Sequence, residues 1–276
     1  MQLLEVKLPG GLPRKGYIER RARFHSLTGS IEQQLIETAV DTDRPGYVTS
    51  VLNSVLASIG EDSADSARIA SLCVADRQYL MLRLAALLDG EQMWLKVACS
   101  HCESFFDVDL RRCDLPIKEA GDGYPLARLR LGGRDIEARV PTGEDQERIN
   151  DLPEDQAMNQ LLQDCICSVD GQPPTIGFSK QLSTSEIEAI DQALDEVSPA
   201  VCNQLRVVCP ECRQEQAAEL DHYAGVRPSE SYLYDEIHTL ASHYHWSETD
   251  ILDLPQKKRR RYVSMINRNT GFSEQR

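Results

Sequence analysis

Two short cysteine pairs constrain the fold of this chain more than any other feature. One pair lies in Cys99–Cys102 and the other in Cys209–Cys212, each as a C-x-x-C motif. Apolar, strand-like residues precede each pair, and alternating residues follow it. A strand, a C-x-x-C turn and a second strand form a zinc knuckle, and two knuckles complete a tetrahedral site of four thiolates. The sequence therefore predicts a structural Zn²⁺ site whose ligands are Cys99, Cys102, Cys209 and Cys212.

Other readings of the cysteines remain open. A cage of four thiolates can also hold iron, and the spacing does not distinguish the two metals. A redox-active pair is disfavoured because it needs a helix N-terminus to stabilise its thiolate, whereas strand-like residues follow both pairs. His101, inside the first knuckle, is an alternative ligand, although a turn histidine that faces water is favoured. Of the remaining cysteines, which are interpreted as small apolar residues, only Cys113 could approach the site.

The spacing between the pairs predicts the organisation of the chain. Roughly a hundred residues separate them, against about 15–20 in a compact ribbon, and the residues from Thr142 to Ser198 have helical patterns. We therefore expect an α+β fold, with a zinc-ribbon-like β core, a helical insertion and a C-terminal helical segment. The expected segments are 1–66 (N-terminal strand and helix segment), 67–140 (first half of the ribbon core), 141–200 (helical insertion), 201–225 (second half of the ribbon) and 226–276 (C-terminal helical docking segment).

Hydrophobic spacing predicts individual elements. Apolar residues from Val48 to Ile59 recur at helical intervals and predict one helix. A second helix, Arg77 to Leu88, is predicted with Asp76 as its cap. Because this helix is apolar almost all round and leads into the first knuckle, we expect it to pack on the knuckle hairpin and form the main core. Gly132-Gly133 between two alternating runs predicts a hairpin.

Charge and composition exclude several classes of protein. The chain has 276 residues and a net charge of −14, with +4 in residues 1–23, +6 in residues 255–276 and −24 between them. This charge disfavours nucleic-acid binding, which needs a basic surface. No apolar run is long enough to span a membrane, and the first residues do not form a signal peptide. A cytoplasmic protein is expected, in which cysteines are thiols or metal ligands rather than disulfides.

The sequence contains no motif that predicts catalysis. Nucleotide-binding glycine loops, H-E-x-x-H and G-x-S-x-G are all missing. The acidic residues are abundant, but no spacing places two carboxylates together. We therefore expect a protein that is not an enzyme.

The last fifty residues contain the candidate partner-binding surface. Ser229 and Ser247 are predicted to cap two helices, and the basic run from Lys257 to Arg261 is predicted to begin a third. A solvated basic face is the plain interpretation of that run, and docking on a protein partner is the preferred one. The candidate residues are His238, His243, His245, Trp246, Arg259, Arg260 and Tyr262.

Several stretches resemble one family. They are Leu72 to Leu80, the two cysteine pairs, Val140 to Gln146, Glu236 to Glu248, Ile251 to Pro255 and Arg259 to Tyr262. This pattern resembles the baseplate hub assembly chaperone family of T-even-like phages and related proteins of contractile injection systems. The resemblance runs from about Leu72 onward and is most specific in the last fifty residues.

The resemblance implies a non-enzymatic role in building the baseplate of a contractile tail. The protein would bind hub or wedge components in the cytoplasm of the bacterial host, and then leave or remain in the tail particle. The alternative from the residues alone is a zinc-ribbon module that binds nucleic acid or serves as a general protein-interaction module.

Overall fold

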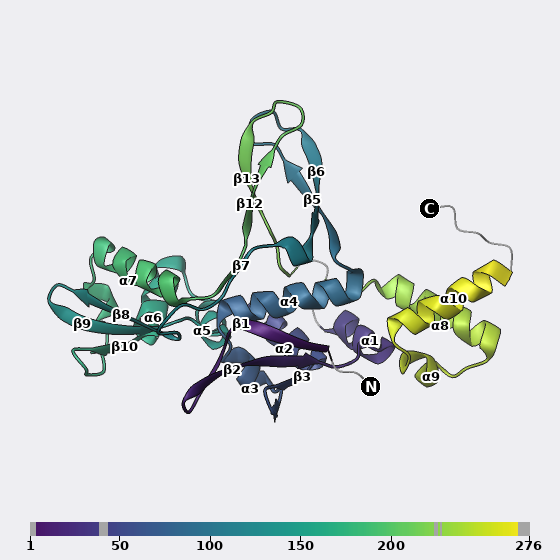
Figure 1. Cartoon of the computed structure of the whole chain (residues 1–276), viewed down its shortest axis with the longest axis horizontal. Helices are drawn as coiled ribbons and strands as arrows, with labels where there is room; N and C mark the ends of the chain where they lie inside the picture. Colours follow the sequence, from purple (N-terminus) through teal and green to yellow (C-terminus); the bar gives the residue numbers. More distant parts are fainter. Residues whose placement is uncertain (1–3, 39–43, 224–225, 227, 270–276) are drawn as a thin grey trace.

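The computed structural model describes residues 4–38, 44–223, 226 and 228–269 (Figure 1). The fold is α+β, with several small sheets rather than one large one. It comprises an N-terminal core, a second lobe, an arm of two β-hairpins and a C-terminal helical segment. Within the described ranges, no helix is long and apolar enough to cross a membrane.

The N-terminal core packs a four-stranded antiparallel sheet against helices. The strands are β1 (Leu4–Arg14), β2 (Tyr17–Phe24), β3 (Leu56–Ile59) and β4 (Asp62–Ser63). The helices are α1 (Gly29–Glu37), α2 (Arg44–Val55), α3 (Ser66–Ala70) and α4 (Val74–Asp89). The single helix expected through Ile59 is wrong in its second half. It ends at Val55 because the next four residues pair with β2, where Ile59 lies opposite Ala22.

Helix α4 forms the main core and packs on the base of the knuckle hairpins, as expected, but most of its buried residues face the N-terminal sheet and helices. Leu80, Met81 and Leu84 are buried in the N-terminal core, whereas Leu82 packs near the base of the knuckle hairpins. Asp76 does not cap the helix, because Cys73 occupies the N-cap position. The buried Asp76 carboxylate instead accepts hydrogen bonds from the backbone N–H groups of Gly10 (2.7 Å) and Gly11 (2.6 Å) in β1.

The second lobe contains the expected helices together with three strands. Its sheet has the order β10-β9-β8, and its apolar residues form one cluster with those of α6 and α7. The predicted Gly132-Gly133 hairpin is confirmed as β8–β9. Its strands pack in the second lobe and not in a ribbon core. The second lobe therefore includes residues on both sides of the boundary expected at residue 140. The elements are β8 (Leu126–Leu131), β9 (Arg134–Arg139), α5 (Gly143–Ile149), α6 (Glu154–Cys165), β10 (Ile166–Val169) and α7 (Thr184–Val197).

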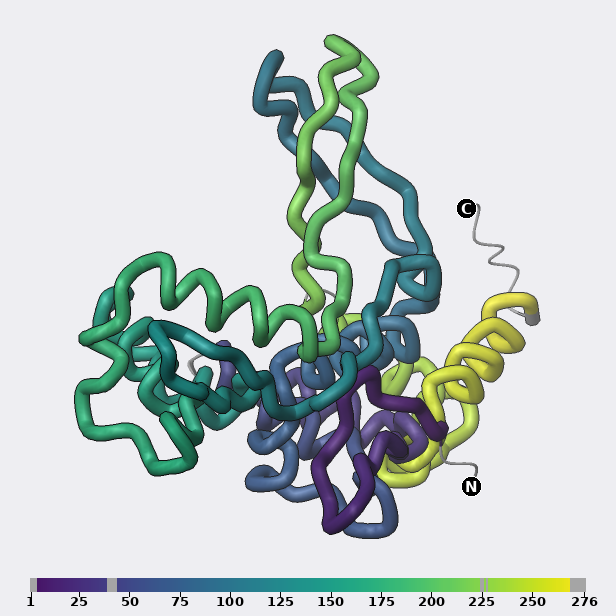
Figure 2. Tube along the Cα trace, turned by 60° about the vertical axis from the view of Figure 1, so that its left-hand side comes forward, coloured from purple at the N-terminus to yellow at the C-terminus, as the bar shows by residue number. Residues whose placement is uncertain are grey.

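Two β-hairpins project from the body as an arm, which we define as residues 92–111 and 204–219 (Figures 1 and 2). The hairpins face each other across Val97, Val207 and Ala218. A short pair of strands, β7 (Ile117–Lys118) and β11 (Ala200–Val201), joins the two chain segments near the base. The arm strands are β5 (Gln92–Ala98), β6 (Phe105–Arg111), β12 (Gln204–Val208) and β13 (Glu215–Glu219).

The C-terminal segment comprises α8 (Glu230–Tyr244), α9 (Glu248–Leu252) and α10 (Gln256–Asn269). Its three helices enclose their own apolar cluster, which also includes Ile36 of α1. The Arg259 side chain is completely buried. Its guanidinium donates to both carboxylate oxygens of Glu32 in α1, at 2.8 and 2.9 Å. This ion pair links the C-terminal segment to α1 of the N-terminal core.

Candidate metal centre

The two C-x-x-C turns at the tip of the arm have the same backbone geometry. The N–H of the first cysteine donates to a carbonyl five residues later, from Cys99 to Ser104 at 2.8 Å and from Cys209 to Gln214 at 3.0 Å. The residue after the second cysteine is left-handed in both turns, with φ of 60° at Glu103 and 59° at Arg213. The local sequence therefore folds each pair into the strand–turn–strand knuckle that was predicted.

The arm brings all four predicted ligands together. Their sulfur atoms lie within 4.8 Å of one another. Cys99 and Cys212 are 3.6 Å apart and Cys102 and Cys209 are 3.7 Å apart, sulfur to sulfur. These distances exceed the bonding distance of about 2.0 Å in a disulfide. They match the edge of about 3.8 Å in a tetrahedron whose metal–sulfur bonds are about 2.3 Å. The geometry thus fits a Cys₄ metal site.

Polar groups around the sulfurs favour thiolates. The Ser104 hydroxyl lies 3.0 Å from Cys102 Sγ and 3.5 Å from Cys209 Sγ. It lowers the pKa of Cys102 and, together with the backbone N–H groups of Cys212 and Glu211, lowers the pKa of Cys209 to about 6.

The fourth sulfur shows the electrostatic cost of placing four thiolates together. A hydrogen bond from the Gln214 backbone favours the Cys212 thiolate, yet burial and the three neighbouring sulfurs raise its pKa to about 12. Four thiolates in such proximity repel one another unless a cation lies between them.

A glutamine side chain joins the two knuckles, and the sequence motif gave no sign of it. Gln216 of β13 accepts a hydrogen bond at its Oε1 from the backbone N–H of Ser100, at 2.8 Å. Its Nε2 donates to the Ala98 carbonyl at 2.9 Å. Ser100 is the residue after the first ligand, so Gln216 fixes the first knuckle from the opposite hairpin. Gln216 lies four positions after Cys212, outside the C-x-x-C motif.

The alternative cysteine and histidine ligands lie outside the cluster. His101 is exposed in the first knuckle and its side chain is not among the clustered donors. Cys113 is exposed, and its sulfur is 3.6 Å from an Asp114 carboxylate oxygen. Four protein thiolates would complete the coordination of a zinc ion, which leaves no position for a reacting water.

The predicted partner-binding residues divide into exposed and buried groups. His238, His243, His245 and Arg260 are exposed. Trp246 is half-buried and stacks on Tyr244 with 4.9 Å between ring centroids, and its ring meets the edge of Tyr262 at 5.1 Å. The prediction that Arg259 binds a partner is corrected, because this side chain is buried and forms an internal ion pair with Glu32. The sequence did not indicate this ion pair, because Arg259 lies in a basic run and Glu32 is 227 positions away.

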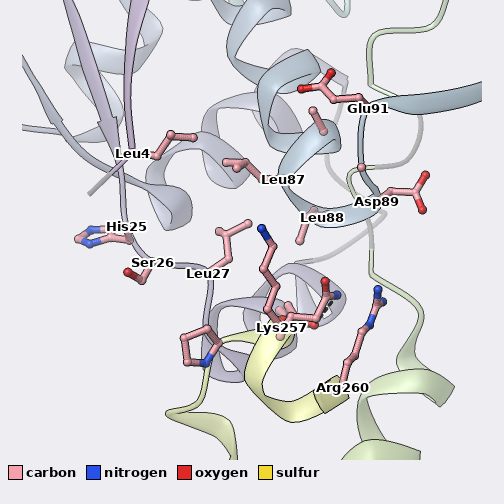
Figure 3. Close-up of a pocket in the computed structure, with 15 residues that line it drawn as sticks. Leu4, His25, Ser26, Leu27, Leu87, Leu88, Asp89, Glu91, Lys257 and Arg260 are labelled. Atoms are coloured by element: carbon pink, nitrogen blue, oxygen red, sulfur yellow. Dashed lines mark hydrogen bonds between the residues drawn. The ribbon is translucent and has the colours of Figure 1, made fainter. Parts of the chain in front are cut away.

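A cavity of about 750 Å³ lies where the C-terminal segment meets the core (Figure 3). In the close-up, the Lys257 side chain of α10 extends toward leucines from β2–α1 and α4. The leucines that line the cavity are Leu4, Leu27, Leu87 and Leu88, and its polar lining includes His25, Asp89, Glu91, Lys257 and Arg260.

Comparison with known proteins identifies the family. The family model described as T4 bacteriophage base plate protein matches residues 6–225. This range contains the N-terminal core, the second lobe and the arm, and ends before α8. The resemblance in the last fifty residues therefore lies outside the matched range. Searches of curated proteins and of solved structures gave no match. The match covers most of the chain, which therefore belongs to the family of T4 bacteriophage base plate proteins.

Proposed function

We propose that this chain is a non-enzymatic assembly chaperone or minor structural component of the baseplate of a contractile phage tail or injection system. It binds hub or wedge proteins in the cytoplasm of the bacterial host. The observation that carries the proposal is the family match over residues 6–225, which includes every part of the body that holds the arm. The arm itself supports a binding role, because it projects from the body (Figure 1).

We also propose that the arm holds one structural Zn²⁺ ion. Cys99, Cys102, Cys209 and Cys212 would bind it, and the ion would contribute folding energy to the arm. Support comes from the two sulfur–sulfur distances near 3.7 Å and from the shared knuckle geometry. Elemental analysis of protein purified without added metal tests this proposal. One equivalent of zinc supports it, one equivalent of iron would identify the alternative metal, and no metal in freshly purified protein would refute both.

The exposed side of the C-terminal segment is the proposed contact with other baseplate proteins. Its three histidines are exposed at α8 and the residue after it, and Arg260 lines the cavity that α10 shares with the core. These groups suit a partner surface that carries carboxylates beside apolar side chains. Because the segment lies outside the family match, we expect it to select the partner of this particular protein.

Binding of purified hub and wedge proteins tests the function. Size-exclusion chromatography of the full chain with each protein in turn should give a stable complex with at least one of them. The triple variant His238→Ala, His243→Ala, His245→Ala should weaken that complex, while Tyr17→Ala, at the far turn of the β1–β2 hairpin, should not. Deletion of the gene should leave incomplete tails. Intact tails together with no complex would refute the proposal, and the protein's presence in purified tails separates a component from a chaperone.

A further inference from the structure

The outer face of the first arm hairpin exposes two large aromatic side chains. Trp94 is 67% exposed and Phe105 is 70% exposed. The residues paired across the strands show that Asp109 lies opposite Trp94 and Asp107 lies opposite Lys96. The Lys96 ammonium is 5.7 Å from the centre of the Phe105 ring, and Asp109 accepts a hydrogen bond from the Gln92 side chain. Both aspartates are exposed on this face with Trp94.

This face does not contribute to the core of the arm. The inner residues of both hairpins form the packed cluster, and the outer residues alternate with them as exposed positions. Exposed aromatic residues of this size are enriched where proteins bind proteins, because they supply much of the binding energy. The arm as a whole has six carboxylates and four Lys or Arg residues, so a basic partner suits it.

Helix α10 presents a surface of the opposite charge. No acidic residue occurs from Gln256 to Asn269. Lys258, Arg261, Met265 and Arg268 are exposed, and at 100° per residue they share an arc of about 80°. Met265 is 40% exposed between the cations. Neither Lys258 nor Arg261 forms an ion pair with any residue in the described ranges.

The two surfaces also agree in length. From Lys258 to Arg268 the helix rises about 15 Å. From Trp94 to Ala98 the strand extends about 13 Å. A guanidinium can bind an aspartate and lie on the face of a tryptophan at the same time. The acidic, aromatic face and the basic stripe are therefore complementary in charge, in chemistry and in size.

We propose that the outer face of the arm hairpin β5–β6 binds the exposed stripe of α10 in a second copy of this chain. The two surfaces cannot meet within one molecule, because the arm and α10 project from separate parts of the body (Figures 1 and 2). The contact joins two different surfaces, so it either closes reciprocally as a dimer or continues from copy to copy into a ring or chain. This self-association is separate from the binding of hub or wedge proteins.

Sedimentation velocity of the purified full chain tests the proposal. At about 0.05 M salt the average mass should rise with protein concentration, and at about 0.5 M salt the rise should diminish because exposed charges are screened. Trp94→Ala and Arg261→Ala should each weaken association about tenfold or more. Tyr17→Ala, an exposed aromatic residue on another surface, should leave it unchanged. A constant monomer mass at low salt would overturn the proposal.

Charge reversal distinguishes this contact from other modes of association. One variant carries Asp107→Lys and Asp109→Lys, and the other carries Lys258→Glu and Arg261→Glu. Each variant alone should be monomeric, because its arm and its helix then have the same sign. An equimolar mixture should associate again, since each arm meets a helix of opposite charge. All four positions are exposed, so melting curves should match the parent. Association of either variant alone, or a mixture that stays monomeric, would contradict the proposal.

Discussion

The side chain of Gln216, on the opposite hairpin, forms hydrogen bonds to the two peptide groups that flank Cys99. Its Oε1 accepts from the Ser100 N–H and its Nε2 donates to the Ala98 carbonyl. Two hydrogen bonds with complementary direction fix the first knuckle against the second. Groups that orient metal ligands in this way contribute to metal affinity without touching the metal.

Substitution of Gln216 should therefore loosen the metal site while leaving the ligands in place. Gln216→Leu should lower metal affinity by about 10–100-fold, because the backbone of the first knuckle loses two partners. Competition with a chromogenic chelator measures the affinity. Gln214→Leu is the matched control, since the exposed Gln214 contributes only backbone groups to the knuckle, its carbonyl to Cys209 and its N–H to Cys212. Equal affinities for the two variants would show that the bridge does not support the site.

Loss of one ligand should unfold the arm and spare the rest of the molecule. Cys99→Ser or Cys209→Ser removes a thiolate, and structural zinc sites contribute folding energy directly. The N-terminal core and the second lobe have apolar clusters of their own. Amide hydrogen exchange should therefore accelerate in residues 92–111 and 204–219 and remain slow in α4. Chelator should reproduce this pattern in the parent, and Cys113→Ser should not. Unchanged exchange in the arm would argue against a structural metal.

The buried ion pair of Arg259 should control attachment of the C-terminal segment. Arg259→Met leaves the Glu32 carboxylate buried without its cation, which costs about 3–5 kcal/mol. The segment should then detach, with faster proteolysis between residues 228 and 269, while the core keeps its melting transition. Arg268→Met, at an exposed position of the same helix, should have little effect. The double variant Arg259→Met, Glu32→Leu should recover part of the loss, because the buried Glu32 charge is removed together with its cation, and Glu236 keeps its contact with Arg260.

Acid should weaken the second lobe through Asp145. Burial disfavours its carboxylate, but hydrogen bonds from Arg139 at 2.6 and 2.7 Å and from Thr142 at 2.8 Å outweigh burial and hold its pKa below the usual value. A lowered folded pKa means that the stabilisation is present above about pH 4 and is lost as pH falls through the folded value.

The Asp145→Asn variant tests this account. It should lose about 2–3 kcal/mol of stability at pH 7 and depend less on pH in the acid range than the parent does. Thermal melting between pH 7 and about pH 3 provides the measurement, with Asp191→Asn, an exposed position in α7, as the control for surface charge. Parallel acid curves for the parent and Asp145→Asn would show that another group is responsible.

Sequence patterns correctly predicted the elements whose structure depends on residues close to them in the sequence. The knuckles follow from strand, turn and strand around each cysteine pair, and α9 begins at Glu248 after the predicted Ser247 cap. Two features depended on distant residues instead. Leu56–Ile59 has helical spacing but becomes a strand because β2 offers an edge. Arg259 sits in a run of five basic residues, and only the fold reveals that Glu32 binds it.

The separation of the two knuckles has a consequence for synthesis of the protein. Cys102 and Cys209 are 107 positions apart, and ribosomes add about 5–20 residues per second. The first pair therefore leaves the ribosome about 5–20 seconds before the second, a time in which the N-terminal core and the second lobe can fold. During this interval the first pair holds only half of a coordination shell. The arm is thus expected to close after the core and the second lobe, and capture of the proposed metal would wait until both knuckles have been synthesised.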